Sequence, residues 1–182
     1  MELFTIALMV YQQRHRLERC LEHIFQQDYK AVELIVCDDD SCDFDVDEVE
    51  AYIYEHKSDQ IQFVTVHKQP AYMGQAAGCQ TALSMAHGTY MMFLTVEQEL
   101  YGKDALTKMA QYFRMAHGSV LVSRSLPFWE DGGQAGGICP SDADIKMLEE
   151  TASGRLFVQF GTHSFEPSIC TAPVCFRKER LE

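Results

Sequence analysis

The chain has 182 residues, of which 47% are hydrophobic and 23% charged, and its formal net charge is −12. This length predicts one domain, or a domain with a small appendage, and enough apolar residues to bury a core. The acidic balance argues against nucleic-acid binding and against docking on an anionic membrane, because both partners need a basic surface. The sequence contains no apolar run long enough for a membrane span, and its seven cysteines lack CxxC spacing, so we expect reduced thiols in a cytoplasmic protein.

The first part of the chain alternates between strand-like and helix-like patterns. Residues 4–10 form a continuous apolar run, which predicts a strand buried on both faces. After it, Leu17, Leu21, Ile24 and Phe25 follow helical spacing and predict an amphipathic helix. Further strands are predicted at residues 32–37, 61–66, 90–94 and 119–123, and further helices at 46–53, 76–87 and 104–116.

Two of these helices carry end signals. Asp45 with Glu48 three residues later resembles a capping pair at the start of the helix near residue 46, and Gly88 is expected to stop the helix at 76–87. The repeated exchange of strand and helix predicts an α/β fold with a mostly parallel sheet and helices on both faces. In such sheets ligands bind beyond the carboxyl ends of the strands.

The pattern changes after residue 125. Glycine-rich and proline-containing loops follow, with a short helix expected at 142–150 and strand-like segments at 156–160 and 169–176. We therefore divide the chain into a ligand-binding half, residues 1–125, and a loop-rich second part, residues 126–182.

A cluster of acids follows the second predicted strand, within and after the segment IVCDDDS (35–41). Eight acids and no base lie between residues 38 and 50, namely Asp38, Asp39, Asp40, Asp43, Asp45, Asp47, Glu48 and Glu50. Acids in a first helical turn suit the helix dipole, which explains the later members. Asp38 and Asp39 stand at the end of a buried strand, where they could bind a nucleobase, ribose hydroxyls or a cation, or form a solvated turn. The pattern alone leaves both interpretations open.

The same cluster allows a calcium-loop hypothesis. Asp39, Ser41, Asp43 and Glu50 fall at positions 1, 3, 5 and 12 of an EF-hand-like count, but Phe44 occupies the position that needs glycine. The chain contains neither GxGxxG nor GxxxxGK[ST], so the two commonest phosphate-binding loops are not supported.

Several motifs in order resemble those of family 2 glycosyltransferases, which have the GT-A fold. They are TIALMVYQQ (5–13), RLERCLEHIFQQDY (16–29), VELIVCDDDS (32–41), Tyr72-Met73-Gly74, the segments 80–83 and 86–90, and FLTVEQELYGKDAL (93–106). The likeness covers residues 3–115 and extends in weaker form to 169–182.

The resemblance implies a nucleotide-diphosphate sugar as donor and a sugar or lipid-linked acceptor. Tyr11 would pack on the base, Asp38 or Asp39 would hydrogen-bond the base or ribose, and Gly74 would belong to the nucleotide site. A D-x-D motif after the fourth strand would hold Mg²⁺ or Mn²⁺ on the diphosphate, and a later carboxylate would act as the base on the acceptor hydroxyl.

The chain departs from the family pattern at the metal motif. It has Thr95, Val96, Glu97 and Gln98 where the family has Asp-x-Asp-Asp, so that Glu97 is the one remaining candidate metal ligand there. Glu130 and Asp131 are weak candidates for the catalytic base, and a surface loop is the favoured interpretation of that pair. The chain also ends about where the catalytic ED segment of the family would follow, so we expect a truncated GT-A domain.

Three functional hypotheses remain open. The chain is an inverting glycosyltransferase domain, a non-catalytic GT-A-like module used in assembly or regulation, or a binding domain with a cation-binding loop. Whether it is an enzyme is not decided by the sequence. Exposed apolar strands beside a missing second half would favour self-association.

Overall fold

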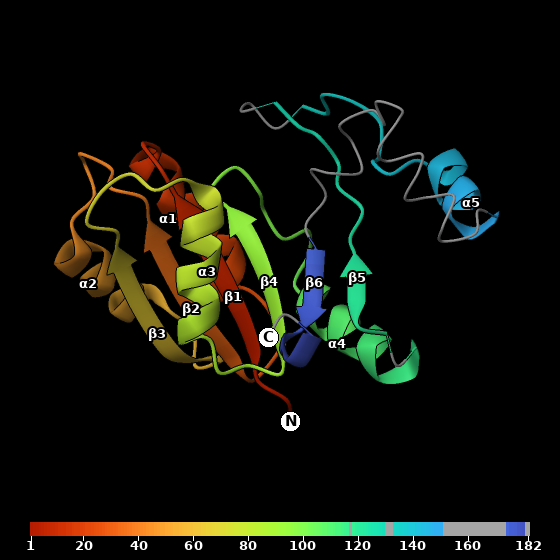
Figure 1. Ribbon diagram of the computed structural model, residues 1–182, viewed down its shortest axis with the longest axis horizontal. Helices are drawn as coiled ribbons and strands as arrows, with labels where there is room; N and C mark the ends of the chain where they lie inside the picture. Colours follow the sequence, from red (N-terminus) through yellow and green to blue (C-terminus); the bar gives the residue numbers. More distant parts are fainter. Residues whose placement is uncertain (117, 130–132, 151–173, 181–182) are drawn as a thin grey trace. The chain divides into compact units, whose positions relative to one another are not determined.

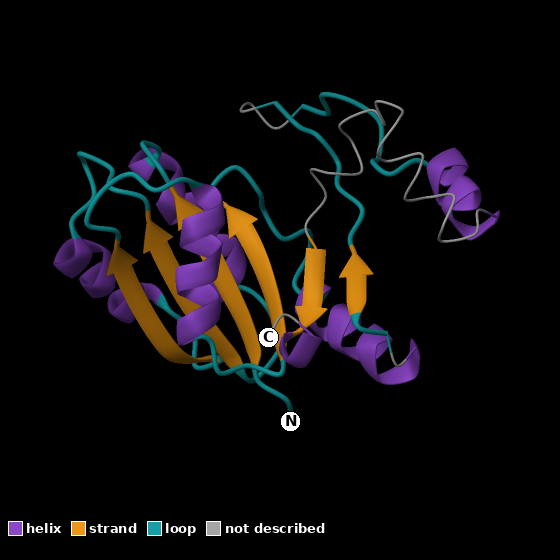
Figure 2. Cartoon of the chain, viewed as in Figure 1, coloured by secondary structure: helices purple, strands orange, loops and turns teal. Residues whose placement is uncertain are grey.

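The computed structural model describes residues 1–116, 118–129, 133–150 and 174–180. Strands and helices alternate along the first two thirds of the chain, as Figure 2 shows. In chain order the elements are β1 (Phe4–Val10), α1 (Arg14–Phe25), β2 (Val32–Asp38), α2 (Val46–His56), β3 (Ile61–Lys68), α3 (Gln75–Met85), β4 (Tyr90–Thr95), α4 (Ala105–Ala116), β5 (Val120–Val122), α5 (Asp142–Glu150), β6 (Val174–Arg177) and the short 3₁₀ helix η1 (Lys178–Arg180). None of the described helices is long and apolar enough to cross a membrane.

The sheet has the strand order β3-β2-β1-β4-β6-β5. β1 pairs in parallel with β2 and with β4, β2 pairs in parallel with β3, and β6 pairs antiparallel with β4. This mixed, mostly parallel sheet confirms the predicted α/β class. The register places Val10 opposite Asp38, and Met9 opposite both Cys37 and Thr95, so β1, β2 and β4 end at one edge of the sheet.

Helices cover both faces of the sheet, as expected. The larger core lies between the sheet and α1, α2 and α4, whose buried residues include Leu21, Ile53 and Phe113. A smaller core forms on the opposite face, where Ala82 and Ala86, in and just after α3, pack on the sheet. Figure 1 shows α3 alone in front of the sheet, with α1 and α2 behind it.

One of the two predicted helix-end signals is confirmed and the other is wrong. Asp45 is the N-cap of α2, and its carboxylate accepts a hydrogen bond from the Glu48 amide at 3.0 Å. Gly88 does not end α3, which stops at Met85. Its physical role is close approach, because a Cβ at Gly88 would lie 2.8 Å from the Thr5 backbone nitrogen and would also contact the Thr5 hydroxyl.

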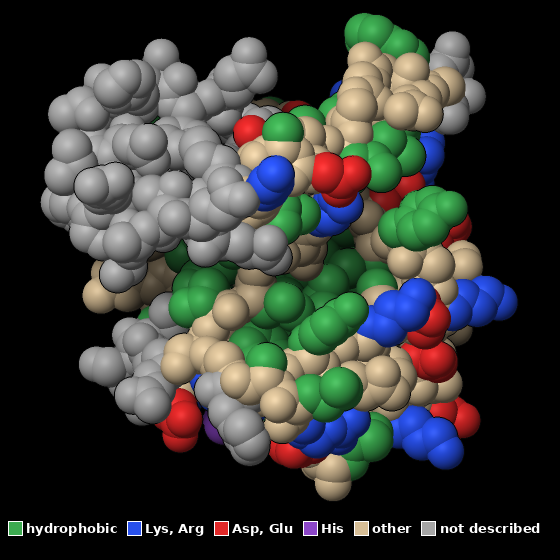
Figure 3. Space-filling view, turned by 90° about the vertical axis from the view of Figure 1, so that its right-hand side faces the viewer, with side chains coloured by type: hydrophobic (Ala, Val, Ile, Leu, Met, Phe, Trp, Pro, Cys, Tyr) green, Lys and Arg blue, Asp and Glu red, His purple; other side chains and the backbone are tan. Residues whose placement is uncertain are grey.

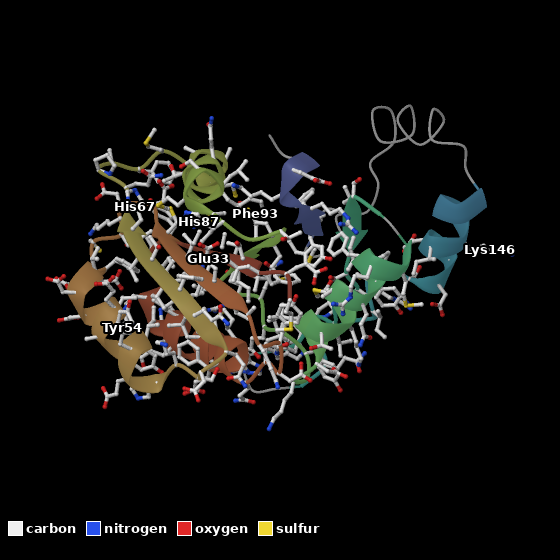
Figure 4. All side chains as sticks on the ribbon, turned by 90° about the horizontal axis from the view of Figure 1, so that it is seen from below. Glu33, Tyr54, His67, His87, Phe93 and Lys146 are labelled. Carbon is white, nitrogen blue, oxygen red and sulfur yellow. The ribbon has the colours of Figure 1, made fainter. Side chains whose placement is uncertain are left out.

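The buried carboxylate of Glu33 hydrogen-bonds to residues on both sides of this close contact between Gly88 and Thr5. Glu33 on β2 accepts hydrogen bonds from Thr5 Oγ1 at 2.5 Å and from the His87 amide at 2.8 Å, and its other oxygen lies 2.7 Å from His87 Nδ1. Figure 4 shows Glu33 and His87 close together in the view from below. Burial by itself raises the pKa of Glu33, but the hydrogen bonds from Thr5 and His87 outweigh it and hold that pKa below its ordinary value.

The chain forms two compact units, Met1–Leu121 with Cys175–Glu182, and Val122–Val174. Within the second unit, Ser141 and Asp144 hydrogen-bond each other at the start of α5, and Ser125 forms an antiparallel bridge with Cys139. The strand-like segment predicted at 156–160 lies outside the described residues. The division after residue 125 into a ligand-binding half and an acceptor-side half stays a prediction.

Exposed hydrophobic side chains occur on the first unit near the β5 edge of the sheet. Tyr112 and Met115 on α4 and Val120 on β5 are each more than half exposed. The space-filling view shows hydrophobic side chains at the surface beside charged ones (Figure 3). The predicted self-association stays a prediction.

Candidate functional site

A pocket of about 300 Å³ opens at the carboxyl ends of β1, β2 and β4, the edge where a ligand was expected. Its walls come from the strand ends, the loops that follow them and the first half of α3. The lining residues are Met9, Val10, Tyr11, Gln13, Cys37, Asp39, Tyr72, Gln75, Gly78, Thr95, Val96 and Glu97. All of them belong to the first unit.

Two tyrosines from different loops form one wall of the pocket. The rings of Tyr11, directly after β1, and Tyr72, after β3, are 4.8 Å apart between centroids and inclined by 42°. Their side chains are substantially exposed, at 46% and 62% for the whole residues. Partly exposed aromatic rings at a pocket are suited to stacking on a flat ligand.

Asp38 secures the loop that carries Tyr11. It is fully buried, and its carboxylate accepts hydrogen bonds from the Ser41 amide at 2.8 Å and from Ser41 Oγ at 2.5 Å. Ser41 Oγ in turn accepts the Gln12 amide at 2.7 Å. Gln12 has φ of +54°, a backbone conformation that needs such support in a residue with a side chain.

Asp39 secures the loop that carries Tyr72. Its two carboxylate oxygens accept the Met73 amide and the Gly74 amide, both at 2.8 Å. Gly74 is the N-cap of α3 and has φ of +85°, which glycine adopts without strain. The adjacent acids at the end of β2 therefore each hold one of the two tyrosine-bearing loops in place. Because a carboxylate oxygen has two lone pairs, Asp39, which lines the pocket, keeps capacity to accept a further hydrogen bond from a ligand.

The segment after β4 closes the other side of the pocket. Gln98 makes two hydrogen bonds with Thr95, both 3.0 Å long. Its side-chain oxygen accepts from the Thr95 backbone N–H, and its backbone N–H donates to the Thr95 carbonyl. Glu97 accepts a hydrogen bond from Gln13 Nε2 at 3.0 Å, and Arg16 Nη1 lies 3.9 Å from the same carboxylate oxygen. Gln98 therefore stabilises a turn, and Glu97 already has two polar partners.

Residues 95–98 offer a divalent metal a single carboxylate, which already has partners in the protein. Mg²⁺ requires near-ideal octahedral oxygen coordination and is usually held by one or two carboxylates together with substrate phosphates. Here Glu97 is the one acid of residues 95–98, and one of its oxygens already accepts from Gln13. Among the described residues no group of three histidine, cysteine, aspartate or glutamate side chains is placed to bind a metal ion. The calcium-loop hypothesis has no support in this part of the chain either.

A cysteine contributes to the pocket floor without being reactive. Burial, together with the smaller effect of the negative charges of Asp38 and Asp39, raises the pKa of the Cys37 thiol to about 11. The thiol is therefore neutral near pH 7, and it is a poor nucleophile and a poor metal ligand.

The structure brings most of the predicted site residues together. Tyr11, Asp39 and Glu97 line the pocket, whereas Asp38 and Gly74 support its walls through their backbone or buried side-chain contacts. Glu130 and Asp131 lie outside the described residues. Sequence reasoning included Tyr72 and Gln13 in the family motifs, but it assigned neither of them a role in the site.

Comparisons with known proteins agree with this arrangement. The model of the family Glycosyl transferase family 2 matches residues 5–168. No curated protein sequence matches the chain.

Solved structures with the same fold include a mannosyltransferase from Pyrobaculum calidifontis in complex with GDP-Man and Mn²⁺, with 20% identity and a TM-score of 0.59 over 65% of this chain and 34% of that one. S. aureus TarS residues 1–349 in complex with UDP-GlcNAc has 19% identity and a TM-score of 0.67, covering 98% of this chain and 46% of that one. The same TarS segment with UDP has 20% identity and a TM-score of 0.61 over 76% of this chain and 40% of that one.

The chain thus spans less than half the length of each of these solved proteins. At this level of identity the likeness establishes the fold alone, and it confirms the GT-A fold that the sequence predicts. Together with the family model, which covers most of the sequence, it leads to one conclusion: the chain belongs to glycosyltransferase family 2.

Proposed function

We propose that the pocket at the ends of β1, β2 and β4 binds the nucleoside part of a nucleotide-diphosphate sugar, the donor of a glycosyltransferase. The observation that carries this proposal is the Tyr11–Tyr72 wall facing a pocket that Asp39 also lines. A flat base can stack on an aromatic ring, and a carboxylate oxygen can accept a hydrogen bond from a base N–H or a ribose hydroxyl.

The solved relatives support a nucleotide ligand. The Pyrobaculum calidifontis enzyme is seen with GDP-Man, and TarS is seen with UDP and with UDP-GlcNAc. We extend nucleotide-sugar binding to this chain, and with it a location in the cytoplasm, which its buried, unpaired Cys20, Cys37 and Cys175 support.

The proposed reaction is transfer of the sugar to a hydroxyl of a sugar or lipid-linked acceptor, with inversion. Inversion in one displacement requires the acceptor oxygen to attack the anomeric carbon on the face opposite the leaving nucleotide, while a base removes the hydroxyl proton. Glu130 and Asp131 remain the candidate bases from the sequence.

A second candidate function is a non-catalytic module that keeps the nucleotide pocket and serves in assembly or regulation. A specific observation favours it: Thr95, Val96 and Gln98 offer no carboxylate at the metal motif. Without a cation to neutralise it, a departing diphosphate is a poor leaving group next to Glu97.

Nucleotide binding is tested by isothermal titration of the chain with uridine, guanosine, UDP and GDP, each with and without Mn²⁺. We expect one base to be preferred, and Tyr11→Ala to weaken its binding by about tenfold, since stacking on an aromatic ring contributes about 1–3 kcal/mol per base. Tyr54→Ala is the matched control, because Tyr54 is 58% exposed on α2 and does not line the pocket. Equal affinities of the two variants would refute the assignment of the pocket.

Catalysis is tested separately from binding. The chain is incubated with UDP-GlcNAc or GDP-Man, and release of UDP or GDP is followed. Release that Tyr11→Ala slows by about tenfold at low donor concentration supports the transferase, whereas binding without release supports the non-catalytic module.

A further inference from the structure

The two charged side chains that line the pocket are both acids, beside neutral tyrosine, glutamine and threonine side chains that can donate as well as accept hydrogen bonds. Asp39 and Glu97 contribute carboxylates, and the lining contains no lysine or arginine. Gln13 Oε1 is a further acceptor: it is buried, and no described donor reaches it, because the amide of the same side chain points to Glu97. A lining of this kind is complementary to a ligand that donates hydrogen bonds.

Ribose hydroxyls and base N–H groups are donors, whereas phosphate oxygens are acceptors with negative charge. Phosphates beside Asp39 and Glu97 would be repelled unless a cation stood between them. In a metal-dependent site a divalent ion performs that task. Residues 95–98 are poorly suited to such an ion here, because Glu97 is the one acid among them and Gln13 and Arg16 already contact it.

A basic side chain that lies near a pocket residue is Arg16 on α1. Its contact with Glu97 is 3.9 Å long, and both side chains are partly exposed, at 35% and 56%. Arg16 offsets the charge of Glu97 without joining the pocket lining. Because Arg16 is paired with Glu97, its positive charge is already partly offset and attracts a diphosphate less strongly.

We infer that the pocket binds an uncharged nucleoside, or the nucleoside part of a larger ligand, without a divalent cation, and that the phosphates add no affinity. This inference rests on the proposed nucleotide binding and specifies how it occurs. It sets the chain apart from the Pyrobaculum calidifontis mannosyltransferase, which is seen with GDP-Man and Mn²⁺.

The first experiment uses the same titrations in two buffers, one containing EDTA and one containing Mn²⁺. For the preferred base, we expect the nucleoside and its diphosphate to bind within about threefold of each other, and the two buffers to agree within about threefold. Binding of the diphosphate that is tighter by about tenfold or more with Mn²⁺ would overturn the inference and leave the proposed function intact. Absence of binding by every nucleoside and nucleotide in both buffers would overturn both.

The second experiment measures binding of Mn²⁺ alone, from the electron paramagnetic resonance signal of the free ion. Glu97→Gln tests the candidate ligand, and Glu99→Gln is its matched control, because Glu99 is paired with Arg19 at 2.6 Å and does not line the pocket. We expect the chain and both variants to leave the same free-ion signal. Loss of free ion with the unchanged chain and with Glu99→Gln, but not with Glu97→Gln, would show a metal site at Glu97 and overturn the inference.

The third experiment restores the family spacing in the variant that carries both Thr95→Asp and Glu97→Asp. We expect Mn²⁺ to tighten UDP or GDP binding by this double variant by about tenfold, while uridine or guanosine binding stays insensitive to the metal. The unchanged chain is the reference in the same assay. A metal effect of equal size in the unchanged chain would refute the inference, whether or not the double variant folds.

Discussion

Asp39 offers a direct test of how the pocket is held together. Its two carboxylate oxygens each accept one backbone amide, from Met73 and from Gly74, and the residue is only 7% exposed. Asp39→Asn keeps one acceptor oxygen but turns an NH₂ group toward the second amide. One hydrogen bond is then lost, and the partly buried backbone N–H of Met73 or Gly74 is left without this partner.

The expected cost follows from these contacts. Leaving a buried donor unsatisfied costs about 1–3 kcal/mol, and hydrogen bonds to a charged group contribute about 1.5–3 kcal/mol each. We therefore expect a loss of about 2–3 kcal/mol in the free energy of unfolding, which for a chain of this size lowers the melting temperature by about 4–12 °C.

The matched control is the neighbouring Asp40. It is exposed, and Asp40→Asn removes the same charge from the same loop while asparagine tolerates its φ of +64°. Thermal unfolding of both variants is followed by circular dichroism. A melting temperature for Asp39→Asn within about 1 °C of that for Asp40→Asn would refute the role of the two amide contacts.

The same variant also separates a direct role in binding from a positioning role. If Asp39 acts by holding the loop that presents Tyr72, then Asp39→Asn and Tyr72→Ala affect the same interaction with a nucleoside. Their combined effect on the binding free energy should then be smaller than the sum, by about 0.5 kcal/mol or more. Strictly additive effects would mean that Asp39 contacts the ligand independently of the loop.

Three further predictions concern the sheet and the pocket. Gly88→Ala should destabilise the chain by about 1–3 kcal/mol in urea unfolding, because its Cβ would lie 2.8 Å from a backbone nitrogen, whereas Gly118→Ala, with no atom nearer than 3.8 Å, should cost little. The pKa of Glu33 is lowered from 4.5, so the stability that its carboxylate contributes is present above pH 4.5 and is lost as pH falls through the folded-state pKa. Glu33→Gln should therefore flatten the pH dependence of the free energy of unfolding in that acid range. An unchanged pH dependence would contradict the assignment. Alkylation at pH 8, read by mass spectrometry, should modify exposed Cys42 well before buried Cys37, and equal rates would contradict the burial of Cys37.

The sheet was predictable because its strands are short apolar runs between helices with a clear period. β1 and β2 are buried along their whole length, which is the pattern that continuous apolar segments predict in a parallel sheet. The antiparallel partner of β4 was harder to place. Its strand, β6, follows more than fifty residues after β5, and no local pattern states which strand it will join.

The candidate site was only partly predictable for a similar reason. The position of Asp38 and Asp39 at a strand end indicated a site. Their separate structural roles depend on contacts with residues both close by and far along the chain. Asp38 acts through Ser41, whereas Asp39 acts on the amides of Met73 and Gly74, 34 and 35 residues away. Sequence spacing could not show that both side chains are largely engaged with the protein.

The structure therefore changes the interpretation of the acidic residues at the site. A cluster of carboxylates normally indicates cation binding, yet Asp38 and Asp39 are held by backbone and hydroxyl donors, and Glu97 is held by Gln13 and Arg16. What the pocket offers to a ligand is its aromatic wall and spare acceptor capacity. These features support the proposed binding of a nucleoside, whereas residues 95–98 contain a single carboxylate that could hold a metal ion on a diphosphate. On the proposed function, this chain would recognise a donor through its aromatic wall, whereas residues 95–98 supply only Glu97 toward activating the diphosphate.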